Sequence, residues 1–325
     1  MKAAFITETG SPDVIQFGDV ADPHAGPGEL LIRNRAVCVN PIDTYVRSGL
    51  IAFDLPKPYF PGCDAAGVVE AIGEGVDGVS VGDRVWCTNQ GLLGRQGTFA
   101  EKIHVNASWC HPIPEGVDFE TAAANALVGV TAHLGLFRCA RIEPGETMLV
   151  IGGTGGVGSM VLQMGKAIGA RVITTAGNDA KCARAIKLGA DHVINYHTHS
   201  IAEETKRLAP KGVQVYWETR RMPNFDEAIE LLAQRGRMVI MAGRDSRPEF
   251  PVGPFYVNEC SLHGFVMFKA TALEMRRSGE EMNRWMAAGR LKANIAQRFP
   301  LGQAAEAHRL QETANVGGKV VLTCD

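Results

Sequence analysis

Hydrophobic and polar positions follow two different patterns along this chain of 325 residues. In the first third, short runs rich in β-branched and aromatic residues are separated by Gly, Pro and Asp. These runs are LLIRNRAVCV, AAGVVEAIG, DRVWCT and FAEKIHV. Such length and spacing are typical of an antiparallel, barrel-like β domain. The first third therefore predicts a β domain.

From about Ala122 apolar strands alternate with stretches of helical periodicity. The expected strands are 147–151, 171–175, HVINY, VQVYW, RMVIMAG and CSLHGFV, and the expected helices start at Gly156 or span 179–188 and 225–233. Strict alternation of this kind indicates a doubly wound parallel sheet with helices on both faces. The tail predicts helices around 272–288 and 302–312 and a closing strand KVVLT. If that strand completes the first domain, the α/β domain is an insertion.

The composition limits the class of partner. Hydrophobic residues make up 46% of the chain and charged residues 21%, and the net charge is -2, so no strong field attracts nucleic acid or an anionic membrane. The N-terminus has no apolar run typical of a signal peptide, and no stretch of about 18 uninterrupted apolar residues occurs. The eight cysteines form no close pair, which argues against a CxxC redox motif. We expect a cytoplasmic protein whose partner is a small molecule, with no nucleic acid and no membrane.

The most specific motif is TMLVIGGTGGVGSMVLQMGKAIGA, in which a predicted strand leads into a glycine-rich stretch and then a helix. Glycines let the backbone turn tightly and approach a pyrophosphate, and the helix N-terminus offers unpaired N–H groups. An ordinary glycine-rich turn is the alternative, but the position at the start of an alternating domain favours a dinucleotide. The expected cofactor-binding residues are Gly153, Thr154, Gly155, Gly156 and Val157.

The end of the second strand of this domain bears on the choice of dinucleotide. NAD-specific sites place an acidic residue there, but this strand ends TTAGN, without a carboxylate at its tip. The missing acid permits a 2′-phosphate, and Lys181 can supply a charge-assisted hydrogen bond to it. A solvated lysine on a helix face is the alternative, and Asp179 weakens the case. The sequence predicts NADPH as the cofactor.

Several motifs together resemble the zinc-free quinone oxidoreductase, or zeta-crystallin-like, branch of the medium-chain dehydrogenase/reductase superfamily over essentially the whole chain. They are AVCVNPIDTYVRSG, YFPGCDAAGVVEAIGEGV, VGDRVW, GTFAE, GVTAH, LGADHVINY, RGRMVIMAG and GGKVVL, in the family's order. The resemblance implies a Rossmann domain at 122–265, inserted into a GroES-like β-barrel domain made of 1–121 and 266–325. It also implies transfer of a hydride from NADPH to a quinone or conjugated enone in the cleft that holds the cofactor.

The resemblance further implies roles for single residues. Asn40 would face the nicotinamide ribose and is a candidate catalytic residue. The other implied cofactor contacts are Thr131 on the path to the nicotinamide, Gly177 beneath the adenosine, Lys181 and Tyr196 at the 2′-phosphate, Ala242, Gly243 and Arg244 after the strand that fixes the carboxamide, and Asn315 and Lys319 in the closing segment.

A catalytic zinc needs three protein ligands, but the corresponding motif positions hold Asn40, Cys63 and Leu127. We therefore expect no metal. Cys63 itself is either a reactive thiol or a small buried core residue.

Two departures from the family concern the acceptor. Related enoyl reductases carry a tyrosine proton donor shortly after RSG, where this chain has Ile51. Tyr45 and Tyr59 remain nearby as candidate catalytic residues, although each also suits an amphipathic position of a barrel. Arg220 and Arg221 replace the family's small turn after VQVYWET. They can bind a carboxylate or phosphate of cofactor or substrate, or form a solvent-facing charged turn.

Three functions follow from these observations. The first is an NADPH-dependent quinone or enone reductase, the second a zinc-free reductase of another carbonyl acceptor such as an aldehyde, and the third an NADPH-binding protein with little turnover. The fold does not decide between them. The apolar run CSLHGFVMF predicts an edge strand, and family members commonly pair there, so we expect a homodimer through the Rossmann domain.

Overall fold

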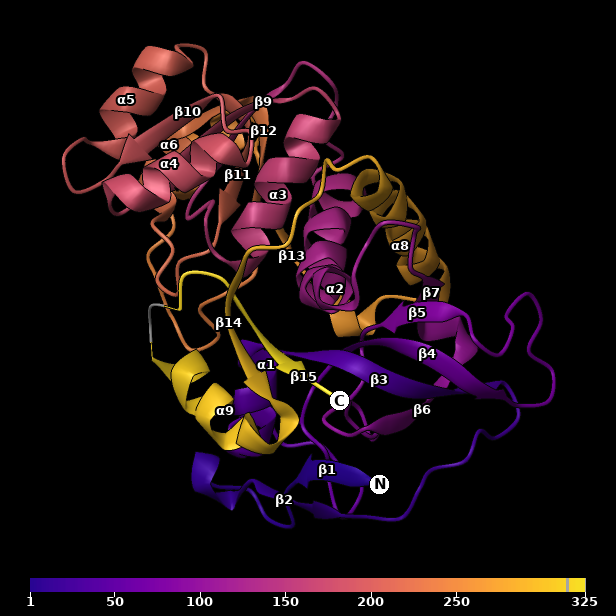
Figure 1. Cartoon of the computed structure of the whole chain (residues 1–325). Helices are drawn as coiled ribbons and strands as arrows, with labels where there is room; N and C mark the ends of the chain where they lie inside the picture. The colour runs from indigo at the N-terminus through magenta and orange to yellow at the C-terminus, as the bar shows by residue number, and fades with distance from the viewer. Residues whose placement is uncertain (314–315, 325) are drawn as a thin grey trace. The chain divides into compact units, whose positions relative to one another are not determined.

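The computed structural model describes residues 1–313 and 316–324, and the chain forms two compact units (Figure 1). Unit 1 comprises Met1–Leu127 and Phe268–Asp325, and unit 2 comprises Val128–Met267. Unit 1 is therefore built from both ends of the chain, with unit 2 inserted between them. These divisions fall a few residues after the boundaries that the sequence pattern suggested.

The sheet of unit 1 is organised around the long strand β3 (Glu29–Val39), which pairs antiparallel with β4, β6 and β15. Burial alternates along the first part of β3 and is continuous over its last four residues, so the strand ends inside the core, next to the buried Asn40. Pairing of β15 with β3 confirms that the closing strand completes the first domain. The other strands of this sheet are β4 (Asp64–Ile72), β5 (Arg84–Cys87), β6 (Lys102–Asn106), β7 (Cys110–Pro112), β14 (Ile295–Pro300) and β15 (Lys319–Thr323), and β1 (Lys2–Phe5) pairs with β2 (Gln16–Asp19).

Two short helices of unit 1 pack against each other beside this sheet. Helix α1 (Pro41–Arg47) begins at a capping box in which Asp43 accepts the N–H of Asn40, and Pro41 occupies a first-turn position that needs no donor. The buried guanidinium of Arg47, the last residue of α1, bonds Glu312 of α9 (Ala304–Glu312) and ties the end of α1 to that helix. The longer helices of this unit are α8 (Ala272–Ala287) and the first part of α2 (Phe119–His133).

Unit 2 contains the expected parallel sheet, with the strand order β10-β9-β8-β11-β12-β13 in its described residues. The chain moves outward in one direction from β8 to β10 and then in the other from β11 to β13, so the order reverses between β8 and β11. Open α/β sheets bind ligands beyond the carboxyl ends of their strands at such a point. The strands are β8 (Thr147–Val150), β9 (Arg171–Ala176), β10 (His192–Asn195), β11 (Val213–Glu218), β12 (Leu232–Ile240) and β13 (Ser261–Gly264).

Helix α3 (Gly156–Ala167) packs unusually close to the sheet because glycines face it. An added Cβ at Gly165 would lie 2.4 Å from Sδ of Met148 on β8, and one at Gly158 would lie 2.3 Å from the carbonyl oxygen of Gly152. Figure 1 shows α3 beside the strands, with α4 and α5 near β10. The remaining helices of unit 2 are α4 (Asp179–Lys187), α5 (Ile201–Leu208), α6 (Phe225–Leu231) and α7 (Val252–Val257), of which α5 and α7 were not expected from the sequence pattern.

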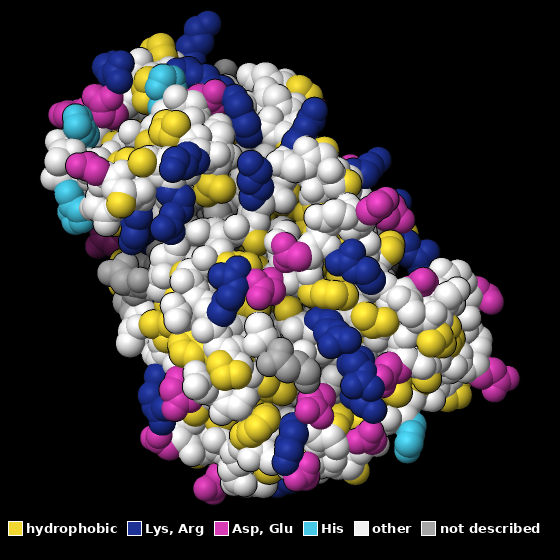
Figure 2. All heavy atoms as spheres, in the orientation of Figure 1, with side chains coloured by type: hydrophobic (Ala, Val, Ile, Leu, Met, Phe, Trp, Pro, Cys, Tyr) yellow, Lys and Arg dark blue, Asp and Glu magenta, His cyan; other side chains and the backbone are white. Residues whose placement is uncertain are grey.

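Charged side chains of both signs are mixed on the surface. On the face shown in Figure 2, basic and acidic side chains are interspersed with apolar ones over both units, in keeping with the net charge of -2. Across residues 1–313 and 316–324, no helix combines the length and apolarity needed to cross a membrane.

Candidate functional site

The loop between β8 and α3 forms a cradle that side chains would fill. Gly152 has φ of +75°, a conformation that favours glycine, and an added Cβ at Gly153 would lie 2.1 Å from Oγ1 of Thr174. Gly155, the N-cap of α3, is exposed, and an added Cβ there would approach the Gly152 carbonyl oxygen no closer than 3.5 Å. The loop is therefore closed toward the sheet and open at the start of the helix. This shape fits a pyrophosphate.

Two threonine hydroxyls at the end of β9 anchor the cradle. The N–H of Gly152 donates to Oγ1 of Thr175 at 3.0 Å, and the N–H of Gly153 donates to Oγ1 of Thr174 at 3.0 Å. The Thr174 hydroxyl in turn donates to the carbonyl oxygen of Val150 at 2.7 Å. Two donors of the loop are thus used within the protein. In the sequence this strand end stood out only for its missing carboxylate, and no local pattern marks the two threonines as anchors of the loop.

The predicted adenosine-binding residues lie at the carboxyl ends of β9 and β10. An added Cβ at Gly177 would lie 2.4 Å from Oη of Tyr196, so the phenol ring lies over this glycine. Lys181 is in the first turn of α4, where its backbone N–H donates to Oδ1 of the N-cap Asn178 at 2.9 Å. Asp179 accepts a hydrogen bond from Asn195 at 3.2 Å. The structure therefore brings Gly177, Lys181 and Tyr196 to one edge of the sheet, as their predicted roles require.

The segments that follow β11 and β12 meet at the same edge. Gly243 has φ of +80°, and an added Cβ there would lie 2.3 Å from the carbonyl oxygen of Arg221. Ala242 and Arg244 flank this contact. Thr131 lies on the part of α2 that belongs to unit 2, with 6% of its surface exposed. Their roles as cofactor contacts remain predictions.

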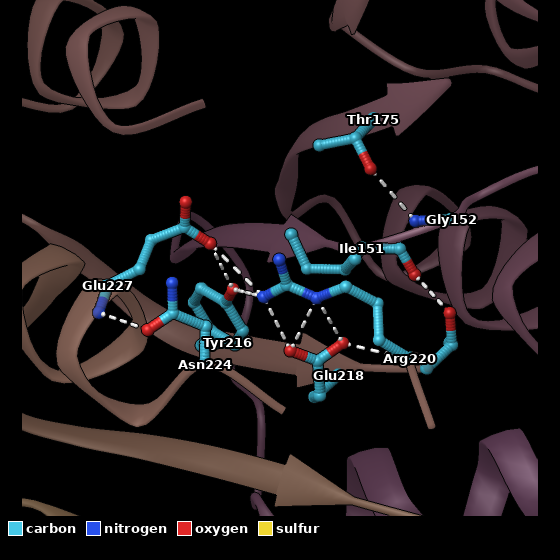
Figure 3. Close-up of polar contacts among 9 residues, drawn as sticks. Ile151, Gly152, Thr175, Tyr216, Glu218, Arg220, Asn224 and Glu227 are labelled. Carbon is cyan, nitrogen blue, oxygen red and sulfur yellow. Dashed lines mark hydrogen bonds and ion pairs between the residues drawn. The ribbon is translucent and has the colours of Figure 1, made fainter. Parts of the chain in front are cut away.

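Arg220 is engaged inside the protein rather than presented to a ligand (Figure 3). Its Nε and Nη2 donate to the carboxylate of Glu218 at 2.7 to 3.0 Å, and Nη2 also donates to Oε1 of Glu227 at 3.1 Å and Oη of Tyr216 at 2.9 Å. The Glu218 side chain is 1% exposed. The guanidinium therefore neutralises the buried carboxylate of Glu218, which no sequence motif singles out. Arg220 and Arg221 do not act as a pair.

A second group of predicted residues lies in unit 1, at the end of β3. The side chain of Asn40 is fully buried; its Nδ2 donates to Oδ2 of Asp64 at 2.8 Å and its Oδ1 accepts a hydrogen bond from Nζ of Lys319. Lys319 also donates to the carbonyl oxygen of Val39 at 3.1 Å, and Asp64 accepts from the hydroxyl of Thr88 at 2.6 Å. Within unit 1 the side chains of Asn40 and Lys319 are thus bonded to each other, and their roles as cofactor contacts remain predictions. Asn315 lies outside the described residues.

Cys63 contacts a second buried carboxyl group of this cluster. Its thiol donates to Oδ1 of Asp43 at 3.0 Å, while Oδ2 of Asp43 accepts the N–H of Asn40 at 2.7 Å. Burial raises the pKa of Asp43 from its ordinary value of 3.8 to about 7, and burial also raises the pKa of Cys63 well above its ordinary value. A thiol that stays protonated is a poor nucleophile. The contacts therefore favour the interpretation of Cys63 as a buried core residue.

The two candidate tyrosines differ in the availability of their hydroxyls. Tyr59 is 2% exposed, its hydroxyl donates to the carbonyl oxygen of Gly91 at 2.8 Å, and burial raises its pKa well above the ordinary value. Tyr45 lies half-buried on α1, and its hydroxyl makes no hydrogen bond to any residue that the structure describes. Both remain predictions, and the geometry favours Tyr45 as the proton donor.

Comparison with known proteins decides the family. Residues 26–115 match the family described as Alcohol dehydrogenase GroES-like domain, and residues 156–287 match the family described as Zinc-binding dehydrogenase. The quinone oxidoreductase of Rattus norvegicus is 32% identical over 325 residues, which cover 99% of this chain and 97% of that protein. The chain belongs to the quinone oxidoreductase group of the medium-chain dehydrogenase/reductase superfamily. The resemblance and the class of enzyme, an oxidoreductase, are thereby confirmed.

Solved structures of this superfamily confirm the fold as well. The quinone oxidoreductase of Escherichia coli complexed with NADPH aligns with a TM-score of 0.87 at 28% identity, covering 99% of this chain and 100% of that one. A protein described as NAD-dependent alcohol dehydrogenase aligns with a TM-score of 0.90 at 32% identity, covering 99% of both chains. Members of the superfamily therefore share this α/β fold of a parallel Rossmann sheet inserted into a GroES-like domain. They also include at least one NADPH complex.

The raised pKa of Asp43 predicts a pH-dependent stability. Between about pH 4 and pH 7 the unfolded chain releases the proton of this carboxyl group and the folded chain keeps it, so the contribution of Asp43 to the free energy of unfolding falls as the pH rises. Asp43→Asn removes the titrating group. We expect the stability of the wild type relative to Asp43→Asn to decline across this range and to level off above about pH 7, as measured by urea unfolding at several pH values.

Asp77→Asn, at an exposed aspartate of unit 1, controls for the general effect of removing a carboxylate. A constant difference in stability between wild type and Asp43→Asn from pH 4 to pH 8 would contradict the assignment.

Proposed function

We propose that this chain is an NADPH-dependent reductase that transfers a hydride to a quinone or a conjugated enone without a metal. The observation that carries the proposal is the arrangement at the carboxyl edge of the unit 2 sheet, where the glycine cradle lies. At the same edge Tyr196 lies over Gly177, and Lys181 lies in the first turn of α4. No carboxylate stands at the tip of β9 to repel a 2′-phosphate. The NADPH complex of the E. coli relative supports the same choice.

The acceptor class follows from the chemistry that the chain can support. NADPH supplies the hydride when bound, and the acceptor then needs one proton. Quinones and conjugated enones spread the resulting negative charge over several atoms, so a few hydrogen-bond donors suffice to stabilise it. The proton comes from water or from the half-buried Tyr45, and comparison of Tyr45→Phe with Tyr59→Phe in the assay below distinguishes these sources.

The proposal of metal-free chemistry rests on the donor set at the end of β3. Of Asn40, Cys63 and Leu127, the last cannot ligate a metal, and Cys63 holds its proton in a bond to Asp43. The ammonium of Lys319 already donates to Oδ1 of Asn40, and a zinc ion placed beside it would bring two cations together. In the described part of the chain, no three His, Cys, Asp or Glu side chains are grouped so that they could hold a metal ion.

The test follows NADPH oxidation by the purified chain with a panel of quinones, conjugated enones and aldehydes. We expect turnover with quinones or enones, because these acceptors delocalise the negative charge, and little turnover with simple aldehydes. A metal chelator should leave the rate unchanged. Turnover confined to aldehydes, loss of activity on chelation, or dinucleotide binding without turnover of any acceptor would each contradict the proposal.

The cofactor assignment predicts a selective effect of Lys181→Gln. Loss of a charge-assisted bond to the 2′-phosphate should raise the dissociation constant of NADPH by roughly tenfold or more. The dissociation constant of NADH should not change, since NADH lacks this phosphate; fluorescence titration measures both. Lys187→Gln, on an exposed lysine at the other end of α4, is the matched control. Equal weakening of both dinucleotides by Lys181→Gln would sink the assignment.

We also infer that two copies of the chain pair through the edge of the unit 2 sheet. Strand β13 pairs with β12 on one side and has no strand partner on its other side among the described residues. Leu262 of β13 is 36% exposed, and three apolar residues of the neighbouring α7 are 62% to 67% exposed: Val252, Tyr256 and Val257. An apolar strand edge of this kind is usually covered or paired.

Sedimentation velocity tests this pairing. The wild type should sediment as a dimer, and Leu262→Lys should sediment as a monomer, because a charge would be buried at the centre of the interface. A monomeric wild type at micromolar concentration would rule it out.

A further inference from the structure

The end of β11 lies against the glycine cradle. The hydroxyl of Thr219 donates to the carbonyl oxygen of Ile151 at 2.7 Å, and an added Cβ at Gly152 would lie 2.7 Å from Oγ1 of Thr219. Figure 3 shows Ile151 and Gly152 beside this part of the chain, with Thr175 bonded to Gly152 from the other side. The chain segment after Thr219 therefore begins in contact with the cradle, between β8 and β11, where the strand order reverses.

The two arginines that follow Thr219 have different surroundings. Arg220 turns back toward β11 and α6, where the carboxylates of Glu218 and Glu227 hold its guanidinium. The side chain of Arg221 is exposed and makes no hydrogen bond or ion pair with any residue that the structure describes. Arg220, Glu218 and Glu227 together carry one net negative charge, so Arg221 is not repelled by an unpaired neighbouring cation.

The backbone of Arg221 has a fixed place at the ligand-binding edge. Its carbonyl oxygen lies so close to Gly243 that a Cβ there would come within 2.3 Å of it. Thr219 contacts the cradle on one side, and Arg221 contacts the segment after β12 on the other. The loop thus spans from β8 to β12 across the carboxyl end of the sheet, and Arg221 is the exposed cation on it.

Two backbone donors of the cradle are already used within the protein and are not available to a bound pyrophosphate. The N–H groups of Gly152 and Gly153 are used by Thr175 and Thr174, which leaves the first turn of α3 as the source of backbone donors. A guanidinium fork matches the geometry of two phosphate oxygens and supplies positive charge as well as hydrogen bonds. We propose that Arg221 binds the pyrophosphate of the dinucleotide, with Arg220 as the positioning residue that fixes its loop.

This inference rests on the proposed function only in requiring that a dinucleotide bind to unit 2. Its test is a binding measurement on the full chain without any acceptor. Arg221→Gln should raise the dissociation constants of NADPH and NADH by a similar factor, roughly tenfold to a hundredfold, because both carry the pyrophosphate. Arg221→Lys keeps the charge and should recover part of the affinity. Fluorescence titration gives the constants, and thermal unfolding of the ligand-free chain checks that the variants fold.

Two further variants make the result specific. Arg235→Gln removes an exposed cation of unit 2 that pairs with Glu259 and should leave both dissociation constants unchanged. Arg220→Gln leaves the buried Glu218 without its partner, so it should lower the unfolding temperature of the ligand-free chain, which Arg221→Gln should not.

Three outcomes would overturn the proposal. Unchanged dissociation constants for both dinucleotides in Arg221→Gln would show that Arg221 does not contact the cofactor. Weakening of NADPH alone would assign Arg221 to the 2′-phosphate. Unchanged dinucleotide binding with a raised KM for acidic acceptors would assign it to the substrate. A chain that binds dinucleotide and reduces no quinone or enone would contradict the proposed function and leave the test of Arg221 intact.

Discussion

Close backbone approach at one point of the unit 2 sheet is the constraint on which the dinucleotide site depends. An added Cβ at Gly158 of α3 would meet the carbonyl oxygen of Gly152. An added Cβ at Gly152 would meet the hydroxyl of Thr219, which follows β11. A side chain at either glycine would push the helix or the neighbouring strand away. The place where the strand order reverses is thereby kept narrow at its base, and the start of α3 remains accessible above it.

Hydroxyl groups and not charged side chains hold this cradle in place. Thr174, Thr175 and Thr219 bond the backbone of the strand end and the loop from both neighbouring strands. The bonds satisfy polar groups that would otherwise be buried without partners. They also occupy the N–H groups of Gly152 and Gly153, so these two donors are not available to a phosphate.

Each unit holds a buried carboxylate against a basic side chain close to its functional residues. In unit 2 the pair is Glu218 with Arg220, and in unit 1 it is Asp64 with Lys319, connected through Asn40. A buried charge is tolerated when it is paired and hydrogen-bonded, and removal of one partner leaves a costly unpaired charge. These pairs give rigid positions to the residues beside them. In the proposed metal-free chemistry, the ammonium of Lys319 provides the positive charge in the donor cluster of unit 1.

The sequence by itself determined the features that depend on local periodicity and on motifs. Alternating strands and helices predicted the parallel sheet, the closing strand predicted the insertion, and the glycine run predicted the cradle, because each pattern lies within a short stretch of chain. Neither the engagement of Arg220 by Glu218 nor the bond between Asn40 and Lys319 followed from such patterns. The second joins residues 279 positions apart, and adjacent arginines look alike in a sequence. Only tertiary structure decided which arginine is held by the buried Glu218 and which is exposed, because that depends on how strands far apart in the chain pack together.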